Sequence, residues 1–88
     1  MFLAYQKADG IKRRQNMVAF AEKYIREHGY APTLAEVAAA LSANENTIRH
    51  HMRQLMRIGD VVGNPLAGRA GSRAWTLPKF AAAIRAAE

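Results

Sequence analysis

The 88-residue chain contains no cysteine, few acidic residues and no long apolar run. Without cysteine it has neither a disulfide framework nor a thiolate metal site, so packing alone must stabilise it, and we expect a cytoplasmic protein. No apolar segment approaches the roughly 18 residues that a membrane-spanning helix needs, so we expect no membrane partner. Seven scattered Asp and Glu residues provide no paired carboxylates and no nucleophile with a base, so the sequence predicts no enzyme and no catalytic residue.

Positive charge is what the chain has in excess. Thirteen Lys and Arg residues give a formal net charge of +6 and a pI near 10.3. The excess lies in residues 1–30 and 61–88, whereas residues 31–60 are neutral in sum. A small basic domain most often binds a polyanion, and nucleic acid is the commonest one. Charge alone leaves open a basic surface that only keeps the protein in solution.

The spacing of apolar residues predicts a first helix from Ile11 to His28, which Gly29 ends. Pro32 then keeps the preceding residue extended, which allows a short edge strand at Tyr30–Pro32. The chain before this helix, residues 1–10, is interpreted as an N-terminal arm.

A capping box and a tight turn follow. Thr33 and Glu36 have the spacing at which each side chain satisfies a free backbone N–H of the other residue, which predicts a second helix from Leu34 to Leu41. Residues 42–44 make the turn, and Asn44 is a favourable N-cap for a third helix that runs to Ile58 and ends at Gly59. Two helices joined in this way are typical of a helix-turn-helix.

The third helix has two unlike faces. Its inward face carries Ile48, Met52 and Leu55 at helical spacing. An ordinary solvated helix face carries carboxylates among its basic side chains, but the outward face of this helix has Glu45 as its one carboxylate. This pattern indicates a nucleic-acid-reading surface, with an ordinary wet face as the alternative. The opposite stripe consists of hydrogen-bond donors at i, i+3, i+4, i+7 and i+11: Asn46, Arg49, His50, Arg53 and Arg57.

A β-hairpin with a basic loop is expected next. Its strands are residues 60–63 and 74–77, and alternation places Trp75 and Leu77 on one face. The connecting loop, residues 64–73, is rich in glycine and has little apolar anchoring. It presents Arg69, Ser72 and Arg73 near its tip. Wings of this kind commonly lay basic residues along phosphates or into the minor groove, although a flexible surface loop explains the glycines equally well.

The order of elements predicts an α+β, mostly α, fold. It is a winged helix-turn-helix of three helices, a two-stranded wing and a short C-terminal helix, with the DNA-binding domain at residues 11–77 and a short helix or tail at 78–88. The arm and the tail carry apolar side chains that either complete the core or pair with a second copy. We expect a homodimer, because a lone half-site reader of this size binds weakly. The residues in question are Phe2, Leu3, Tyr5, Phe80 and Ile84.

Two segments between Gln15 and Leu77 carry a family resemblance. The entry to the second helix reads HGYAPTLAEVAAAL, and the third helix with the first wing strand reads NTIRHHMRQLMRIGDVV. Both resemble the winged helix-turn-helix domains of bacterial repressors, most closely the DNA-binding domain of LexA-type proteins. Since no self-cleaving peptidase domain follows within the 88 residues, the resemblance implies DNA binding without damage-triggered autoproteolysis. Together with the donor stripe it predicts these DNA-binding residues: Thr33, Asn44, Glu45, Asn46, Thr47, Arg49, His50, Arg53, Arg57, Arg69, Ser72 and Arg73.

The leading hypothesis is a sequence-specific regulator of transcription, acting as a repressor, that binds double-stranded DNA. Residues 45–58 would read the major groove, where Arg49 suits guanine and Asn46 suits adenine, and the wing would contact the backbone or minor groove. The alternative is a winged-helix protein-interaction module, an adaptor or inhibitor that docks on a nucleic-acid machine.

No metal or cofactor is expected. His50 and His51 point about 100° apart on a helix and cannot hold one ion from one face. His28 lies on another predicted helix, and no nearby carboxylate completes a zinc site.

Overall fold

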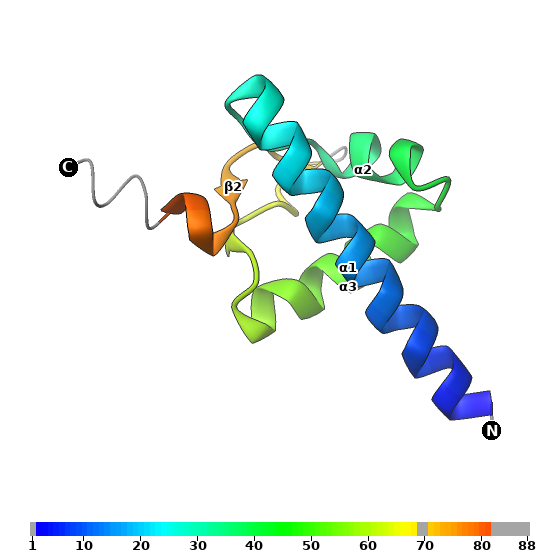
Figure 1. Ribbon diagram of the computed structural model, residues 1–88. Helices are drawn as coiled ribbons and strands as arrows, with labels where there is room; N and C mark the ends of the chain where they lie inside the picture. The colour runs from blue at the N-terminus through cyan, green and yellow to red at the C-terminus, as the bar shows by residue number, and fades with distance from the viewer. Residues whose placement is uncertain (1, 69–70, 82–88) are drawn as a thin grey trace.

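The computed structural model describes residues 2–68 and 71–81. For residues 2–9 it describes the backbone and not the side chains. Within the described residues three helices precede a two-stranded antiparallel sheet (Figure 1). Residues 78–81 add one helical turn. This is the predicted winged-helix order, with each strand two residues shorter than expected. The elements are α1 (Phe2–His28), α2 (Leu34–Ala40), α3 (Glu45–Ile58), β1 (Val62–Gly63) and β2 (Trp75–Thr76). None of the described helices combines the length and the hydropathy that crossing a bilayer requires.

Helix α1 is longer than predicted. It begins at Phe2 and not at Ile11, so the backbone of the expected arm is helical and continues through Gly10 without a break. Residues 2–9 contain no proline and no β-branched residue, and most are good helix formers. One glycine costs about 1 kcal/mol in a helix interior, which is too little to end a helix that is favoured on both sides. The N-terminal turns of α1 extend past the other helices (Figure 1).

Both predicted helix N-caps are present. The Thr33 hydroxyl accepts from the Glu36 backbone N–H at 3.2 Å, and the Glu36 carboxylate accepts from the Thr33 N–H at 2.8 Å. The Asn44 side-chain oxygen accepts from the backbone N–H of Asn46 at 2.7 Å. Helix α3 ends as predicted at Gly59, which has a φ of +85°. The capping signals in the sequence therefore set the limits of the helix-turn-helix.

Backbone bonds fix the turn between α2 and α3. Leu41 is the C-cap of α2, so this helix ends one residue earlier than predicted. Ser42 adopts a left-handed φ of +51°, and the N–H of Ala43 donates to the carbonyl of Ala38 at 2.9 Å. The turn thus connects two helices that pack directly on each other.

The core lies between the three helices and the base of the wing. The inward face of α3 is buried as predicted, and Trp75 and Leu77 share a buried face. The half-buried Phe80 packs against this core, so of the two alternatives for its side chain the structure supports core completion. The side chains of Phe2, Leu3 and Tyr5, and all of Ile84, lie outside the described residues. The buried apolar residues are Met17, Ala21, Ala31, Leu34, Val37, Ala38, Ile48, Met52, Leu55, Val61, Trp75 and Leu77.

The segment Tyr30–Pro32 is not a strand, so that prediction was wrong. The carbonyl of Ala31 accepts from Arg73 Nη1 at 3.1 Å, and the carbonyl of Pro32 accepts from the indole Nε1 of Trp75 at 3.1 Å. Side chains from the wing satisfy these carbonyls in place of a neighbouring backbone, so within residues 2–68 and 71–81 the sheet has two strands.

The wing loop is anchored to the core, contrary to the prediction that it has little apolar anchoring. Pro65 is fully buried and Leu66 packs against the core. The N–H of Ser72 donates to the Pro65 carbonyl at 3.0 Å, which joins the two ends of the loop. Gly71 has a φ of +84°, and a Cβ there would lie 2.6 Å from Leu34 Cγ. The loop therefore needs both the conformation and the small size of glycine at this position.

This contact predicts that alanine substitution destabilises the protein more at one wing glycine than at another. Gly68 has a similar φ of +80°, but the atom nearest to its added Cβ would be 3.9 Å away. Both substitutions incur the left-handed penalty, and only Gly71→Ala also overpacks Leu34. We expect Gly71→Ala to lower the free energy of unfolding by about 1–3 kcal/mol more than Gly68→Ala. Urea unfolding followed by circular dichroism measures the difference, and equal losses would show that the loop is not seated on α2.

Candidate nucleic-acid interface

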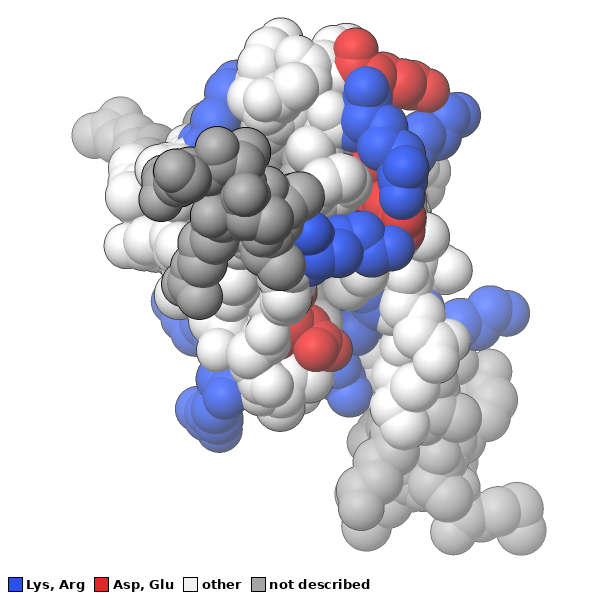
Figure 2. Space-filling view, turned by 60° about the vertical axis from the view of Figure 1, so that its left-hand side comes forward, with Lys and Arg blue, Asp and Glu red and all other residues white. Residues whose placement is uncertain are grey.

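The predicted donor stripe forms the outer face of α3. Asn46, His50, Arg53 and Arg57 are exposed and Arg49 is half-buried. The sole carboxylate of α3 is Glu45, at its first residue. On the face shown in Figure 2, basic side chains outnumber acidic ones, and acidic side chains lie beside basic ones. The outer face of α3 is thus rich in donors, and the burial of its opposite face fixes its orientation.

Polar groups at the start of α3 are partly used by the helix itself. The exposed Asn44 caps it through its side-chain oxygen, which leaves the amide nitrogen as a donor. Glu45 is exposed and Thr47 is half-buried. Further along, the amide nitrogen of Gln54 lies 3.2 Å from Nε2 of His50. Because an amide nitrogen only donates, Nε2 of His50 is the acceptor in this contact.

Arg49 connects α3 to the wing. Its Nη1 donates to the backbone carbonyl of Leu66 at 3.1 Å. A guanidinium has five N–H donors in a planar fork, so one arginine side chain can serve more than one acceptor. The contact joins residues 17 apart in the sequence, and no local pattern in the sequence indicates it.

The structure places Ser72 and Arg73 at the base of the wing, so the prediction that they lie near its tip was wrong. Arg73 Nη1 lies 2.8 Å from a Glu36 carboxylate oxygen and donates to the hydroxyl of Tyr24 at 3.1 Å. Its guanidinium also lies 4.8 Å from the ring centroid of Tyr30. The hydroxyl of Ser72 accepts from the N–H of the residue two positions later at 2.8 Å. Both side chains are thus bonded inside the protein, and Arg69 lies outside the described residues.

Glu36 is held ionised at the junction of three elements. The N–H of Thr33 is the largest influence, and the Arg73 guanidinium and the hydroxyls of Tyr24 and Thr33 also donate to the carboxylate. Together they lower the pKa of Glu36 from 4.5 to about 2, against a smaller opposing effect of burial. Glu36 is therefore negative at neutral pH and balances the charge of Arg73. The hydroxyl of Thr33 is used in the same cluster.

His51 lies beside the stripe, between α1 and α3. It is half-buried, and Arg14 Nη1 is 3.3 Å from its Nδ1. Burial, followed by the nearby positive charges of His50, Arg14 and Arg13, lowers the pKa of His51. Because His51 is neutral at neutral pH, it accepts a hydrogen bond from Arg14. Among the described residues no group of three or more His, Asp or Glu side chains is placed to hold a metal ion.

Residues 9–70 match the family model described as the LexA DNA binding domain. The chain belongs to this family. A LexA repressor from Carboxydothermus hydrogenoformans is 29% identical over 59 residues, which cover 66% of this chain and 29% of the repressor. The matched part of the chain therefore covers less than a third of that repressor's length. No solved structure matches the chain.

The family match confirms the predicted resemblance, starts earlier in the chain and ends at residue 70 instead of Leu77. It begins six residues before Gln15, inside α1, and includes the whole helix-turn-helix and β1. The first turns of α1, residues 2–8, precede the match, and β2 follows it. The first turns of α1 therefore lie outside the matched region.

The Glu36 cluster predicts how the LexA-type domain responds to acid. Because the pKa of Glu36 is lower in the folded chain, its stabilising effect is complete above about pH 5 and is lost as the pH falls towards 2. Glu36→Gln removes this titration and weakens the pairing with Arg73. We expect its Tm to lie a few degrees below that of the unchanged chain at pH 7, and this gap to narrow as the pH falls to 2.5.

Thermal melts at half-unit pH intervals test this. Glu27→Gln is the control, because Glu27 is exposed and its ion pair is long, with 3.9 Å between its Oε1 and Lys23 Nζ in the same helix. A gap for Glu36→Gln that stays constant from pH 7 to 2.5 would contradict the assignment.

Proposed function

We propose that this DNA-binding domain is a sequence-specific regulator of transcription, acting as a repressor. In this proposal α3 enters the major groove of double-stranded DNA and the wing contacts the backbone or the minor groove. The observation that carries it is the outer face of α3, which presents hydrogen-bond donors along its length while its inner face is buried. Membership of a DNA-binding family supplies the ligand class, and we propose no catalytic role.

In this proposal, residues in the first half of α3 contact the DNA bases. Asn46 is exposed, and its amide matches the N6 and N7 edge of adenine. Arg49 matches O6 and N7 of guanine, and one of its donors would then leave the Leu66 carbonyl or be shared with it. Each pair of this kind supplies about 1–3 kcal/mol of discrimination between bases.

Basic side chains on α3 and on the neighbouring part of α1 would contact the phosphates. Arg53 and Arg57 continue the stripe towards the end of α3. On α1, Lys12, Arg13 and Asn16 line a polar recess with Leu41, beside the turn that leads into α3. Each phosphate neutralised contributes about −0.9 to the slope of log affinity against log salt.

The proposed contact set is smaller than the predicted one. We leave out Thr33 and Arg73, whose side chains bond to Glu36, and Ser72, whose hydroxyl bonds a backbone N–H at the base of the wing. Asn44 and Arg49 also bond within the protein but are kept, because they belong to α3 and its cap. Arg69 remains a prediction. The contacts proposed on α3 and its cap are Asn44, Glu45, Asn46, Thr47, Arg49, His50, Arg53 and Arg57.

We further propose that the regulator acts as a homodimer. A domain of this size reads one short half-site, and two copies on a two-fold symmetric site multiply both affinity and specificity. Phe80 packs on the core, so the surface for a second copy has to be sought elsewhere on the chain.

The test separates base readout from phosphate binding. A duplex is selected from a random library, and fluorescence anisotropy then compares it with a scrambled duplex at several salt concentrations. We expect Asn46→Ala to weaken binding to the selected duplex by about 5- to 100-fold and to change binding to the scrambled duplex little. Arg57→Ala should weaken both equally and reduce the salt slope by about 1.

Arg26→Ala is the matched control for loss of an exposed arginine. Arg26 lies on α1 and is paired with Glu22 at 2.7 Å, so its removal should leave both affinities nearly unchanged. If the wild-type chain binds selected and scrambled duplexes equally, base readout is refuted. The donor stripe would then be assigned to an acidic protein surface, the alternative function.

A further inference from the structure

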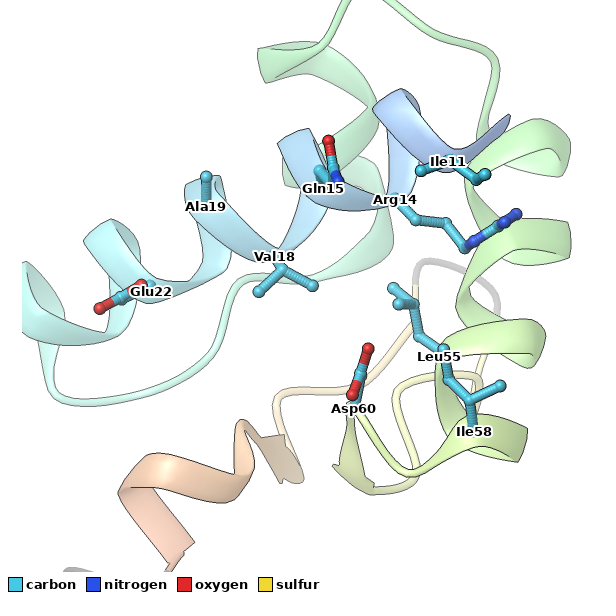
Figure 3. A pocket seen from close by; sticks show the side chains of 9 residues that line it. All are labelled: Ile11, Arg14, Gln15, Val18, Ala19, Glu22, Leu55, Ile58 and Asp60. Atoms are coloured by element: carbon cyan, nitrogen blue, oxygen red, sulfur yellow. The ribbon is translucent and has the colours of Figure 1, made fainter. Parts of the chain in front are cut away.

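A groove runs between α1 and the C-terminal end of α3. It has a volume of about 470 Å³. Ile11 and Val18 line it from α1, and Leu55 and Ile58 line it from α3 (Figure 3). Ile11 is 50% exposed and Ile58 is 64% exposed, which makes them the two most exposed large apolar side chains among the described residues. The groove is therefore an apolar surface in contact with water.

The charged side chains of the groove have opposite signs at its two ends. Arg14 lies beside Ile11 at one end, and Glu22 lies at the other (Figure 3). Lys79 and Arg26 each lie 2.7 Å from Oε1 of Glu22, and within the described residues no bond is made to its Oε2. Asp60, which forms no ion pair in the described part of the chain, also lines the groove.

We infer that this groove is the surface on which a second copy of the chain docks, with the two α1 helices antiparallel about a two-fold axis beside Val18. Arg14 and Glu22 are each four residues from Val18, about 6 Å along the helix axis in opposite directions. A two-fold axis there places Arg14 of each copy against Glu22 of the other. A surface that carries both signs in this arrangement complements itself, which is what an isologous dimer requires. An acidic or a basic partner would instead match a groove of one sign.

The groove does not overlap the proposed DNA surface. Ile58 is nine residues after Arg49, which places the two about 180° apart around the helix. A second copy in the groove therefore leaves the outer face of α3 accessible on both copies. This inference rests on the proposed function, because it names the surface of the proposed homodimer, whose purpose is to present two α3 helices to one symmetric DNA site.

The length of α1 also suits pairing of this helix with its own copy. Its N-terminal turns extend past α2 and α3 (Figure 1) and precede the region that matches the family. A groove of this size is small beside the roughly 800 Å² per partner of a standard stable interface. We therefore expect weak association without DNA, with a dissociation constant of roughly 10 µM to 1 mM.

Sedimentation equilibrium of the full 88-residue chain without DNA tests the inference. We expect a reversible monomer–dimer equilibrium that saturates at twice the 9.7 kDa chain mass. Ile58→Gln should weaken the association by about tenfold or more, because it removes apolar surface from the rim of the groove. Val62→Gln is the matched control, since Val62 is 39% exposed and does not line the groove, and it should dimerise like the unchanged chain.

A charge exchange tests the predicted register. Arg14→Glu and Glu22→Arg chains should each stay monomeric when alone, because like charges then face each other twice. An equimolar mixture of the two should dimerise again, since both contacts then join opposite charges. Circular dichroism confirms that each variant is folded.

The inference would be overturned by a chain that stays monomeric at about 1 mM, by an Ile58→Gln chain that associates as strongly as the unchanged chain, or by a mixture of the two charge variants that fails to restore the dimer. Growth in mass beyond the dimer would also refute it, because a two-fold contact closes. The assay contains no DNA, so these results leave the proposed DNA binding untouched. Loss of DNA recognition in the anisotropy assay likewise leaves the dimer standing.

Discussion

The carboxylate of Glu36 joins the parts of this domain that the chain order keeps apart. It caps α2 through the N–H and the hydroxyl of Thr33, and it accepts the hydroxyl of Tyr24 from α1 and the guanidinium of Arg73 from the wing. Arg73 and Trp75 in turn bind the two carbonyls that precede α2. One ionised group thus connects the first helix, the helix-turn-helix and the wing, and the position of the wing beside α3 depends on it.

The arginines of the chain divide between two tasks. Arg73 and Arg49 bind acceptors of the protein itself, with the exposed Arg73 at the base of the wing and Arg49 between α3 and the wing loop. Arg53 and Arg57 stay exposed on α3. The net charge of +6 therefore overstates the positive charge that can pair with a polyanion, because some of the arginines already bind acceptors of the protein itself. The local arrangement of charge, more than its sum, determines which surface is suited to DNA.

Features that depend on neighbouring residues were predictable from the sequence. The capping box at Thr33, the cap at Asn44 and the end of α3 at Gly59 follow from local bonding and backbone geometry. The two faces of α3 follow from helical periodicity. Contacts between distant residues were not predictable, since nothing near Arg73 indicates that it meets Glu36, and nothing near Gly71 indicates that it lies against Leu34. The start of α1 was not predicted, although residues 2–9 contain mostly good helix formers and one glycine costs only about 1 kcal/mol in a helix interior.

The bond from Arg49 to Leu66, with the burial of Pro65, fixes the described ends of the wing loop to α3 and the core. In the proposed complex, α3 and the base of the wing would therefore approach DNA as one rigid body with a set distance between them. A duplex that meets both has to supply the adjustment itself, by bending or by narrowing a groove. Base steps that the protein never touches then influence affinity through their stiffness.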